Sequence, residues 1–134
     1  MFHVKHLPLL ALLLAPTTAA AQGPIPCNQW NFIHDAGATP MTQFVMGDPL
    51  RRIGICGYTL IASGNAATFQ LAYGTGTNCA TGQTPLSPVI GLPNGCTLVN
   101  RNPDIVERTP PGQNLCAVAT GSGTLDIIVY WAFF

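Results

Sequence analysis

The sequence predicts an all-β protein, an antiparallel β-sandwich of jelly-roll or Greek-key type with roughly eight to nine short strands. Turn residues interrupt short apolar runs about every ten positions, and no stretch keeps a long helical period. Glycine, proline, threonine and asparagine are abundant, whereas lysine and glutamate, which favour exposed helices, are nearly absent. Some runs are apolar on both faces, as expected of strands covered by a second sheet.

Residues 1–21 have the pattern of a secretory signal peptide. A basic start precedes an apolar run over residues 7–15, and Ala19 to Ala21 provide small residues for cleavage before Gln22. The apolar run is too short for a lasting transmembrane anchor. We therefore expect a secreted or periplasmic protein with a cleaved signal peptide, and an uncleaved N-terminal tether is the alternative.

The remaining chain consists of a linker over residues 22–26 and one β-sandwich domain over residues 27–134. Beyond residue 21 it keeps four arginines, five acidic residues and no lysine. Such a surface lacks the basic patch that nucleic acids and anionic lipids require. We expect no nucleic-acid partner and no stable membrane insertion. A domain of this size is only marginally stable without crosslinks.

Disulfides are the expected crosslinks. Export would place five cysteines in an oxidising compartment, where spaced cysteines usually form bridges. The odd number allows at most two bridges within one chain and leaves one thiol unpaired. The absence of C-x-x-C spacing argues against zinc and redox sites. The five positions are Cys27, Cys56, Cys79, Cys96 and Cys116.

Four strands are expected in the first half of the domain. The first two cover Cys27 to Ala36 and Met41 to Met46. Arg52 to Ala62 is apolar or small on both faces, which favours an inner strand. Thr68 to Tyr73 alternates large apolar with smaller or polar residues, which indicates one dry face. Because Ser63 to Asn65 is a turn cluster, we expect the last two strands to form a hairpin.

The second half begins with weaker strand signals. Three prolines restrict Thr84 to Leu92 to an edge strand or a shaped loop. Cys96 to Asn100 predicts a short strand. Arg101 to Pro111 combines prolines with charges, so we expect an exposed loop with a brief strand over Ile105 to Thr109. Gln113 to Thr120 predicts the next strand.

The last expected strand, Thr124 to Phe134, is apolar on both faces. One interpretation is an inner strand between two sheets. The other is a subunit interface anchored by Trp131, Phe133 and Phe134. The second interpretation predicts a homo-oligomer or another protein partner.

Three motifs suggest chemistry only weakly. His34 and Asp35 form a His–acid pair, but neighbours on a strand point to opposite faces and no serine lies in a G-x-S-x-G elbow. Gly74 to Gly82 lacks the Lys-Ser/Thr and the helix of a phosphate loop, so it predicts a tight loop pinned by Cys79. Asn100 to Asp104 spaces oxygen ligands as calcium loops do, but lacks their glycine and distal acid. We expect no catalytic residue, metal or cofactor, and no enzyme; a hydrolase is a remote alternative.

Five aromatic residues could form a platform for stacking sugars. All lie inside strand-like runs, where packing in the core is the more common role of a large ring. A glycan is therefore an alternative ligand rather than the expected one. The residues are Trp30, Tyr58, Tyr73, Tyr130 and Trp131.

Several segments resemble a group of small, uncharacterised β-sandwich proteins of tailed bacteriophages and prophages, which are regarded as virion-associated. The segments are Arg52 to Tyr58, Phe69 to Gly82 with its Y-G-T-G-T-N-C-A-T-G string, Thr109 to Cys116 and Val129 to Phe133. The resemblance covers most of the domain in the same order. It implies a compact sandwich acting as a virion decoration, tail or adhesion component, with oligomeric assembly and no catalytic residues.

The same resemblance implies a disulfide arrangement. It makes four cysteines the patterned set, with Cys27 bonded to Cys56 and Cys79 bonded to Cys116, and leaves Cys96 unpaired. The export signal departs from this group, because virion parts assemble in the cytoplasm. We therefore expect a secreted, non-catalytic structural or interaction module descended from the same fold. A cell-surface or glycan-binding module is the alternative.

Overall fold

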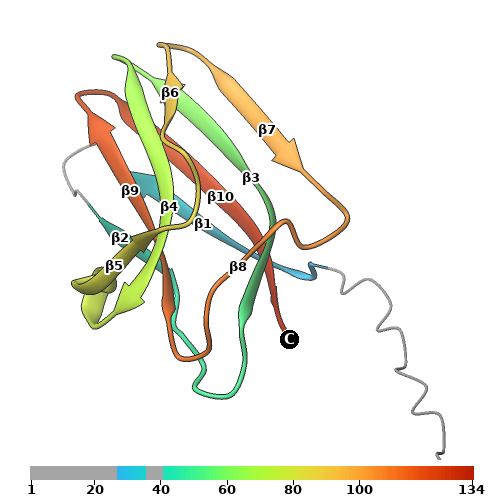
Figure 1. The fold of residues 1–134 in the computed structure, drawn as a ribbon. Helices are drawn as coiled ribbons and strands as arrows, with labels where there is room; N and C mark the ends of the chain where they lie inside the picture. Colours follow the sequence, from blue (N-terminus) through green and yellow to red (C-terminus); the bar gives the residue numbers. More distant parts are fainter. Residues whose placement is uncertain (1–26, 36–40) are drawn as a thin grey trace, which may run out of the picture.

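The computed structural model describes residues 27–35 and 41–134 (Figure 1). These residues form two antiparallel sheets of five strands each, and a single 3-10 turn over Thr77–Cys79 is their only helical element. The predicted signal peptide and linker, residues 1–26, lie outside the described residues. No helix within the described ranges is long or apolar enough to span a bilayer.

Sheet A contains the first and the last strand of the domain. Its order is β1-β10-β3-β7, and β8 also pairs with β3. The strands are β1 (Gln29–Asp35), β10 (Thr124–Phe133), β3 (Ile53–Ser63), β7 (Thr97–Arg101) and β8 (Glu107–Arg108).

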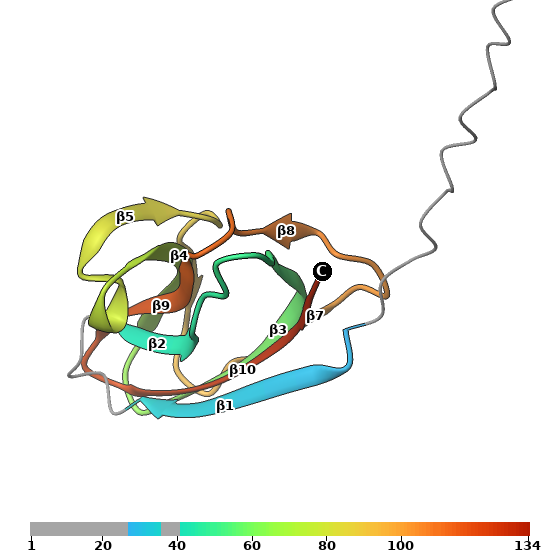
Figure 2. The same cartoon turned by 90° about the horizontal axis from the view of Figure 1, so that it is seen from below.

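Sheet B has the matching arrangement. Its order is β2-β9-β4-β5, and β6 also pairs with β4. The strands are β2 (Thr42–Val45), β9 (Asn114–Gly121), β4 (Ala67–Thr75), β5 (Thr81–Pro85) and β6 (Ile90–Leu92). Seen from below, β1 and β10 run side by side along one side of the sandwich, and β5 lies on the opposite side (Figure 2).

This connectivity is that of a jelly roll. The first strand pairs with the last and the second with the one before the last, because the two halves of the chain pair as one long antiparallel ribbon that winds into the sandwich. Strands β5 and β6 share the partner β4, and β7 and β8 share the partner β3, so ten strands occupy eight ladder positions. The predicted fold class is confirmed, and the extra strands arise because two edge strands are each interrupted.

The predicted hairpin between the third and fourth strands is wrong. β3 belongs to sheet A and β4 to sheet B, so the turn after Ser63 carries the chain from one sheet to the other. Both are inner strands, as predicted for β3, and distant segments occupy their edges. The two strands instead face each other across the core, where the rings of Tyr58 and Phe69 lie 5.4 Å apart.

The core fills the space between the sheets and comes from alternate residues of the inner strands. Burial of each large apolar side chain contributes roughly 1.5 to 3 kcal/mol, which makes this layer the main source of stability. The largest fully buried apolar side chains are Phe69, Ile53, Ile55, Leu60, Leu71, Leu115, Leu125, Ile127 and Val129.

Proline-containing loops interrupt the two edge strands. Between β5 and β6, the loop over residues 86–89 docks on β4: Leu86 donates its N–H to the Leu71 carbonyl at 2.8 Å, and the Leu71 N–H donates to the Ser87 hydroxyl at 2.9 Å. Between β7 and β8, the N–H groups of Asn102 and Val106 still bond to β3, and residues 103–105 leave the ladder. Both loops belong to the edge formed by β5, β6, β7 and β8.

Two disulfides crosslink the domain. Cys27 is bonded to Cys56 and Cys79 to Cys116, and Cys96 is a half-buried free thiol. This is the arrangement that the resemblance implied. The first bridge ties the start of the domain to β3, and the second ties the 3-10 turn to β9. Two disulfides are typical of proteins that fold in an oxidising environment.

The glycine-threonine loop is a tight loop held by Cys79, as predicted. Asn78 and Cys79 both have positive φ, and a Cβ on Gly74 would lie 2.9 Å from the Cys79 Cβ, so glycine lets β4 approach the bridge. The Asn114 side chain donates to the Gly76 carbonyl at 2.9 Å. The Gln43 N–H donates to the Asn78 side chain at 3.1 Å and joins the loop to β2.

Candidate functional site

The outward side of sheet A carries the largest exposed rings of the described residues. On β1 the alternation of a strand directs Trp30, Phe32 and His34 outwards and Asn31 and Ile33 towards the core. Trp30 is 64% exposed and Phe32 is 52% exposed. Exposed apolar side chains that gather in a patch usually mark an interaction surface.

Strand register continues this patch across the sheet. Directly opposed residues share a face, so each position on β1 begins a row that runs through β10 and β3 to β7. The three rows are Trp30, Tyr130, Gly57 and Arg101; then Phe32, Ile128, Thr59 and Val99; then His34, Asp126, Ile61 and Thr97. We call these twelve residues the outer face. Its middle row is apolar apart from Thr59, and its charges lie in the two flanking rows.

Arg101 and Tyr130 form one charged end of the outer face. The guanidinium carbon lies 3.9 Å from the centre of the Tyr130 ring, and the guanidinium donates to the phenol oxygen. That hydrogen bond, with a smaller contribution from Thr59, lowers the pKa of Tyr130 below its usual value of 10.0. Arg101 has no carboxylate partner among the described residues.

His34 and Asp126 form the other charged end. The His34 Nδ1 lies 2.5 Å from the Asp126 carboxylate, across the β1–β10 pair. The sequence indicated Asp35 as the neighbouring acid, but the partner is 92 positions away in the chain. The pair lies on the exposed surface and serves as a cross-strand contact.

The prediction of Trp131 as an interface anchor is wrong. Its side chain is only 6% exposed and lies in the core, because β10 is an inner strand and this position faces sheet B. Phe133 is half-buried, packs against the core and stacks edge-on against Trp131 at 5.0 Å. Phe134 is also half-buried, and Arg108 lies over its ring. An interface role for Phe133 and Phe134 stays a prediction, whereas the exposed rings lie on β1.

The sequence did not distinguish exposed from buried rings among the aromatic residues of the proposed sugar platform. Trp30 is exposed and Trp131 is buried, while Tyr58, Tyr73 and Tyr130 are half-buried. All five lie in strand-like runs, so the local pattern could not separate them. The register of β1 on β10 places Trp30 on the outward face of sheet A and Trp131 on the face that packs against sheet B.

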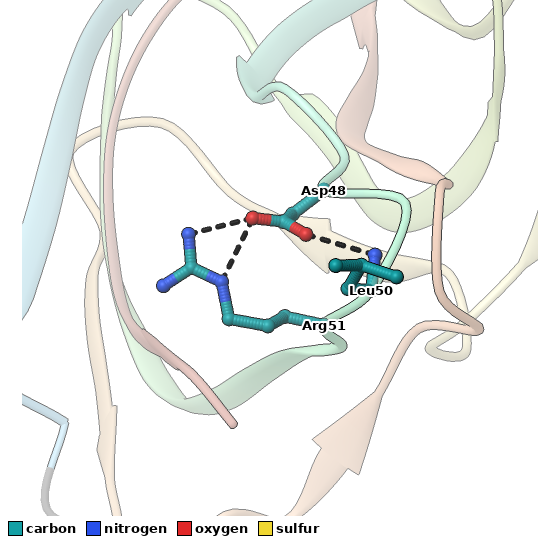
Figure 3. Close-up of polar contacts among 3 residues, drawn as sticks. All are labelled: Asp48, Leu50 and Arg51. Carbon is teal, nitrogen blue, oxygen red and sulfur yellow. Dashed lines mark hydrogen bonds and ion pairs between the residues drawn. The ribbon is translucent and has the colours of Figure 1, made fainter.

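A turn at the end of the sandwich positions Arg51 (Figure 3). One carboxylate oxygen of Asp48 accepts the Leu50 N–H at 2.9 Å, and the other accepts Nε and Nη2 of Arg51 at 2.8 and 2.6 Å. These bonds, led by that from Leu50, lower the pKa of Asp48. Arg51 in turn lies over the Phe133 ring at 4.3 Å. The turn therefore places a guanidinium over the ring of the half-buried Phe133.

The motif with calcium-like spacing forms an ordinary turn. The Asn102 side chain accepts the Asp104 N–H at 3.1 Å, which closes an Asx turn next to Pro103. Within residues 27–35 and 41–134, no cluster of three or more His, Cys, Asp or Glu side chains could hold a metal.

A cleft opens between the sheets at the interrupted edge. Its volume is about 260 Å³, somewhat below the usual range for a drug-sized ligand. Strands β3 and β4 form its floor, and the two proline-containing loops with the ends of β7 and β8 form its walls. The lining residues are Ile55, Gly57, Tyr58, Leu71, Ser87, Pro88, Asn100, Val106 and Glu107.

No protein-family model matches the sequence, and no curated protein matches it. Among solved structures, the chain is similar to the crystal structure of PirA, with 14% sequence identity and a TM-score of 0.46. That match covers 84% of this chain and 99% of the PirA chain.

Proposed function

We propose that the protein is a secreted, non-catalytic structural module that acts through the outer face and assembles with a second copy of itself. The observation that carries this proposal is the exposure of Trp30 and Phe32 on one side of an edge strand. Removing such rings from water drives association, and aromatic residues are enriched in the cores of interfaces.

The chemistry of the outer face favours a second copy as the partner. The two outer faces would pack against each other about a two-fold axis that runs parallel to the strands, above the line between β10 and β3. Each β1 would then lie opposite the β7 of the other copy. Trp30 would then face Arg101, whose guanidinium can stack on an indole ring, and Phe32 would face Val99. Tyr130 would face Gly57, which leaves space for the ring. In the rows of Trp30 and Phe32, large side chains thus meet small or complementary ones, as an isologous contact favours.

Two further features support the proposal. The disulfides and the N-terminal segment with signal-peptide character agree with export to the periplasm or the medium. The resemblance to small phage proteins supports a structural role that works by surface contact. In this proposal the chain is a secreted relative of such proteins.

Sedimentation of the purified protein over a wide concentration range tests the self-association. We expect a dimer that buries well over ~1,000 Å² and dissociates on dilution. Trp30→Ser and Phe32→Ser should each shift the equilibrium towards monomer. Leu50→Ser is the matched control, because Leu50 is 89% exposed but lies outside the outer face. A wild-type protein that stays monomeric at the highest concentration would refute the proposal.

A glycan-binding module is the second candidate, and the exposed indole of Trp30 favours it. A flat aromatic ring can stack on the C–H face of a sugar, and the His34–Asp126 pair on the outer face could bond to hydroxyl groups. A glycan array with wild-type protein and Trp30→Ala tests this function. Binding that disappears in the variant supports it, and an array without signal removes it.

A further inference from the structure

The cleft between the sheets carries a second inference, independent of the outer face. It lies where both edge ladders are interrupted, so neither a strand nor a loop closes this side of the core. Its floor is formed by Ile55 and Leu71, which are each only 1% exposed, and Val106 adds to the apolar lining. A small apolar group could therefore be buried here without displacing a strand.

The polar groups of the cleft are directed inwards by strand register. Glu107 is paired with the core residue Ile55, and Asn100 is paired with Tyr58, which contacts the core. Because opposed residues share a face, the Glu107 and Asn100 side chains lie on the inner side of sheet A. A carboxylate on the core side of a sandwich is unusual and needs a compensating contact.

The structure provides no such contact for Glu107. Among the described residues, the Glu107 carboxylate has neither an ion-pair partner nor a side-chain hydrogen bond, and the cleft lining includes no basic residue. Glu107 is half-buried, so water reaches it through the cleft opening. The cleft is consequently a small apolar space with a carboxylate at its rim that no described protein group pairs with.

The other polar groups add acceptors. The Asn100 amide donates to the Tyr58 hydroxyl at 3.3 Å, which leaves the Asn100 side-chain oxygen and a Tyr58 lone pair available. The Ser87 hydroxyl is already used, because it accepts from the Leu71 N–H and donates to the Pro88 carbonyl. An incoming group therefore meets two carboxylate oxygens, an amide oxygen and a phenol oxygen.

From this combination we infer that the cleft binds an alkyl-ammonium group. The aliphatic stem would lie on Ile55, Leu71 and Val106, and the ammonium would donate its three hydrogens to Glu107 and the neighbouring acceptors. An anionic ligand would meet the Glu107 charge without a compensating cation. The ligand is either a free aliphatic amine or a lysine side chain of another protein. Residues 27–134 contain no lysine, so the sandwich domain of a second copy cannot supply it.

Titration of the isotope-labelled, disulfide-bonded protein, followed by NMR, tests this site. The probes are n-butylamine and N-acetyl-lysine methylamide, and N-acetyl-norleucine methylamide is the uncharged match. We expect saturable amide shifts at Asn100, Val106 and Glu107 with both charged probes and none with the norleucine derivative. Binding of n-butylamine alone would identify a free amine, and preference for the lysine derivative would identify a protein side chain.

Two variants then distinguish specific binding at Glu107 from non-specific attraction to negative charge on the protein surface. Glu107→Gln keeps the shape of the side chain and should weaken binding by about tenfold or more, because a charge-assisted hydrogen bond is lost. Asp104→Asn removes an exposed charge from the neighbouring loop and should leave the affinity unchanged. Equal binding to wild type and Glu107→Gln, saturation by methyl glycosides instead of amines, or no shift with any probe would overturn the inference.

Discussion

The indole N–H of Trp131 donates a hydrogen bond of 2.9 Å to the side-chain oxygen of Asn31, 100 positions away in the chain. The Asn31 side-chain nitrogen in turn donates to the Phe44 carbonyl at 2.7 Å. The β2–β9 register shifts at Phe44, which frees that carbonyl from the ladder. One amide therefore joins β1 and β10 in sheet A to β2 in sheet B, and satisfies the buried indole.

Asn31→Ala should destabilise the fold by roughly 2 kcal/mol, because it leaves the Trp131 N–H and the Phe44 carbonyl without partners. Urea unfolding measured by Trp fluorescence checks this prediction. Gln29→Ala, an exposed position on the same strand, is the control and should change the free energy of unfolding little. Equal stability of the two variants would show that the Asn31 bridge does not contribute.

Gly57→Ala should destabilise the protein by about 2 to 3 kcal/mol or prevent folding. Gly57 has a φ of 152°, and a Cβ at this position would lie 2.0 Å from the Asn100 carbonyl oxygen. Thermal unfolding monitored by circular dichroism checks the effect. Gly91→Ala is the matched control and should be tolerated, because a Cβ at Gly91 would meet no atom within 4 Å. A Gly57→Ala protein as stable as Gly91→Ala would contradict the close packing of β3 on β7.

The Cys27–Cys56 disulfide should be reduced before Cys79–Cys116. Cys27 is half-buried, whereas both sulfurs of the second bridge belong to residues with no exposed surface. Stepwise reduction and alkylation, read by mass spectrometry, should show one labelled thiol in unreduced, denatured protein and three after mild reduction of the native protein. Release of all four bridged thiols together would contradict this order.

Removal of the Cys79–Cys116 bridge, with both residues replaced by alanine, should cost about 2 to 4 kcal/mol. The bridge closes a separation of 37 positions and pins the 3-10 turn against β9. Denaturant unfolding of the double variant measures this cost. Cys96→Ala, which removes a thiol without breaking a bridge, is the control for the loss of cysteine itself.

Asp48 should stabilise the fold above about pH 4 and lose this effect on acidification. Its pKa in the folded state is lowered from 3.8, chiefly by the Leu50 N–H and then by Arg51, so folding favours the ionised carboxylate. As the pH falls through the lowered pKa, the folded protein takes up the proton and the contribution disappears. Asp48→Asn should therefore be less stable than wild type at neutral pH, and the difference should shrink in acid.

Thermal midpoints measured from neutral to acidic pH follow this difference. Asp104→Asn is the control, because Asp104 is exposed and its carboxylate accepts no hydrogen bond from the described residues, the Asn102 side chain bonding only to its backbone N–H. A constant difference between wild type and Asp48→Asn across the range would show that the Asp48 charge does not contribute.

The sequence alone was sufficient for the class of the fold but not for its wiring. The period-two alternation of β4 and the two apolar faces of β10 marked these strands correctly, because burial of one or both faces leaves a local record in the chain. The local pattern of apolar residues does not indicate which strands pair with each other. The turn at Ser63 to Asn65 looks like a hairpin turn, yet it carries the chain between sheets because β10 and β9 occupy the edges where β3 and β4 would have met.

The candidate site was less predictable for the same reason. Trp30 and Trp131 both lie in strand-like runs, and only the β1–β10 register shows that Trp30 is on the outward face of sheet A and Trp131 on the face that packs against sheet B. The partner of His34 and the inward direction of Glu107 depend on registers between segments distant in the chain. The prolines before β6 and β8 did indicate an edge strand or shaped loop and an exposed loop with a brief strand, although not that both segments belong to interrupted edges that enclose a cleft.

The pairing of β1 with β10 also affects how the molecule is made. A ribosome releases residues 29–35 long before residues 124–133, so β1 stays without its neighbour until β10 has been synthesised. During that interval its unprotected ladder and two bulky rings are open to capture by chaperones or by nascent chains alongside. Correct folding therefore requires that β10 be synthesised and pair with β1 before a chaperone or another chain binds that strand.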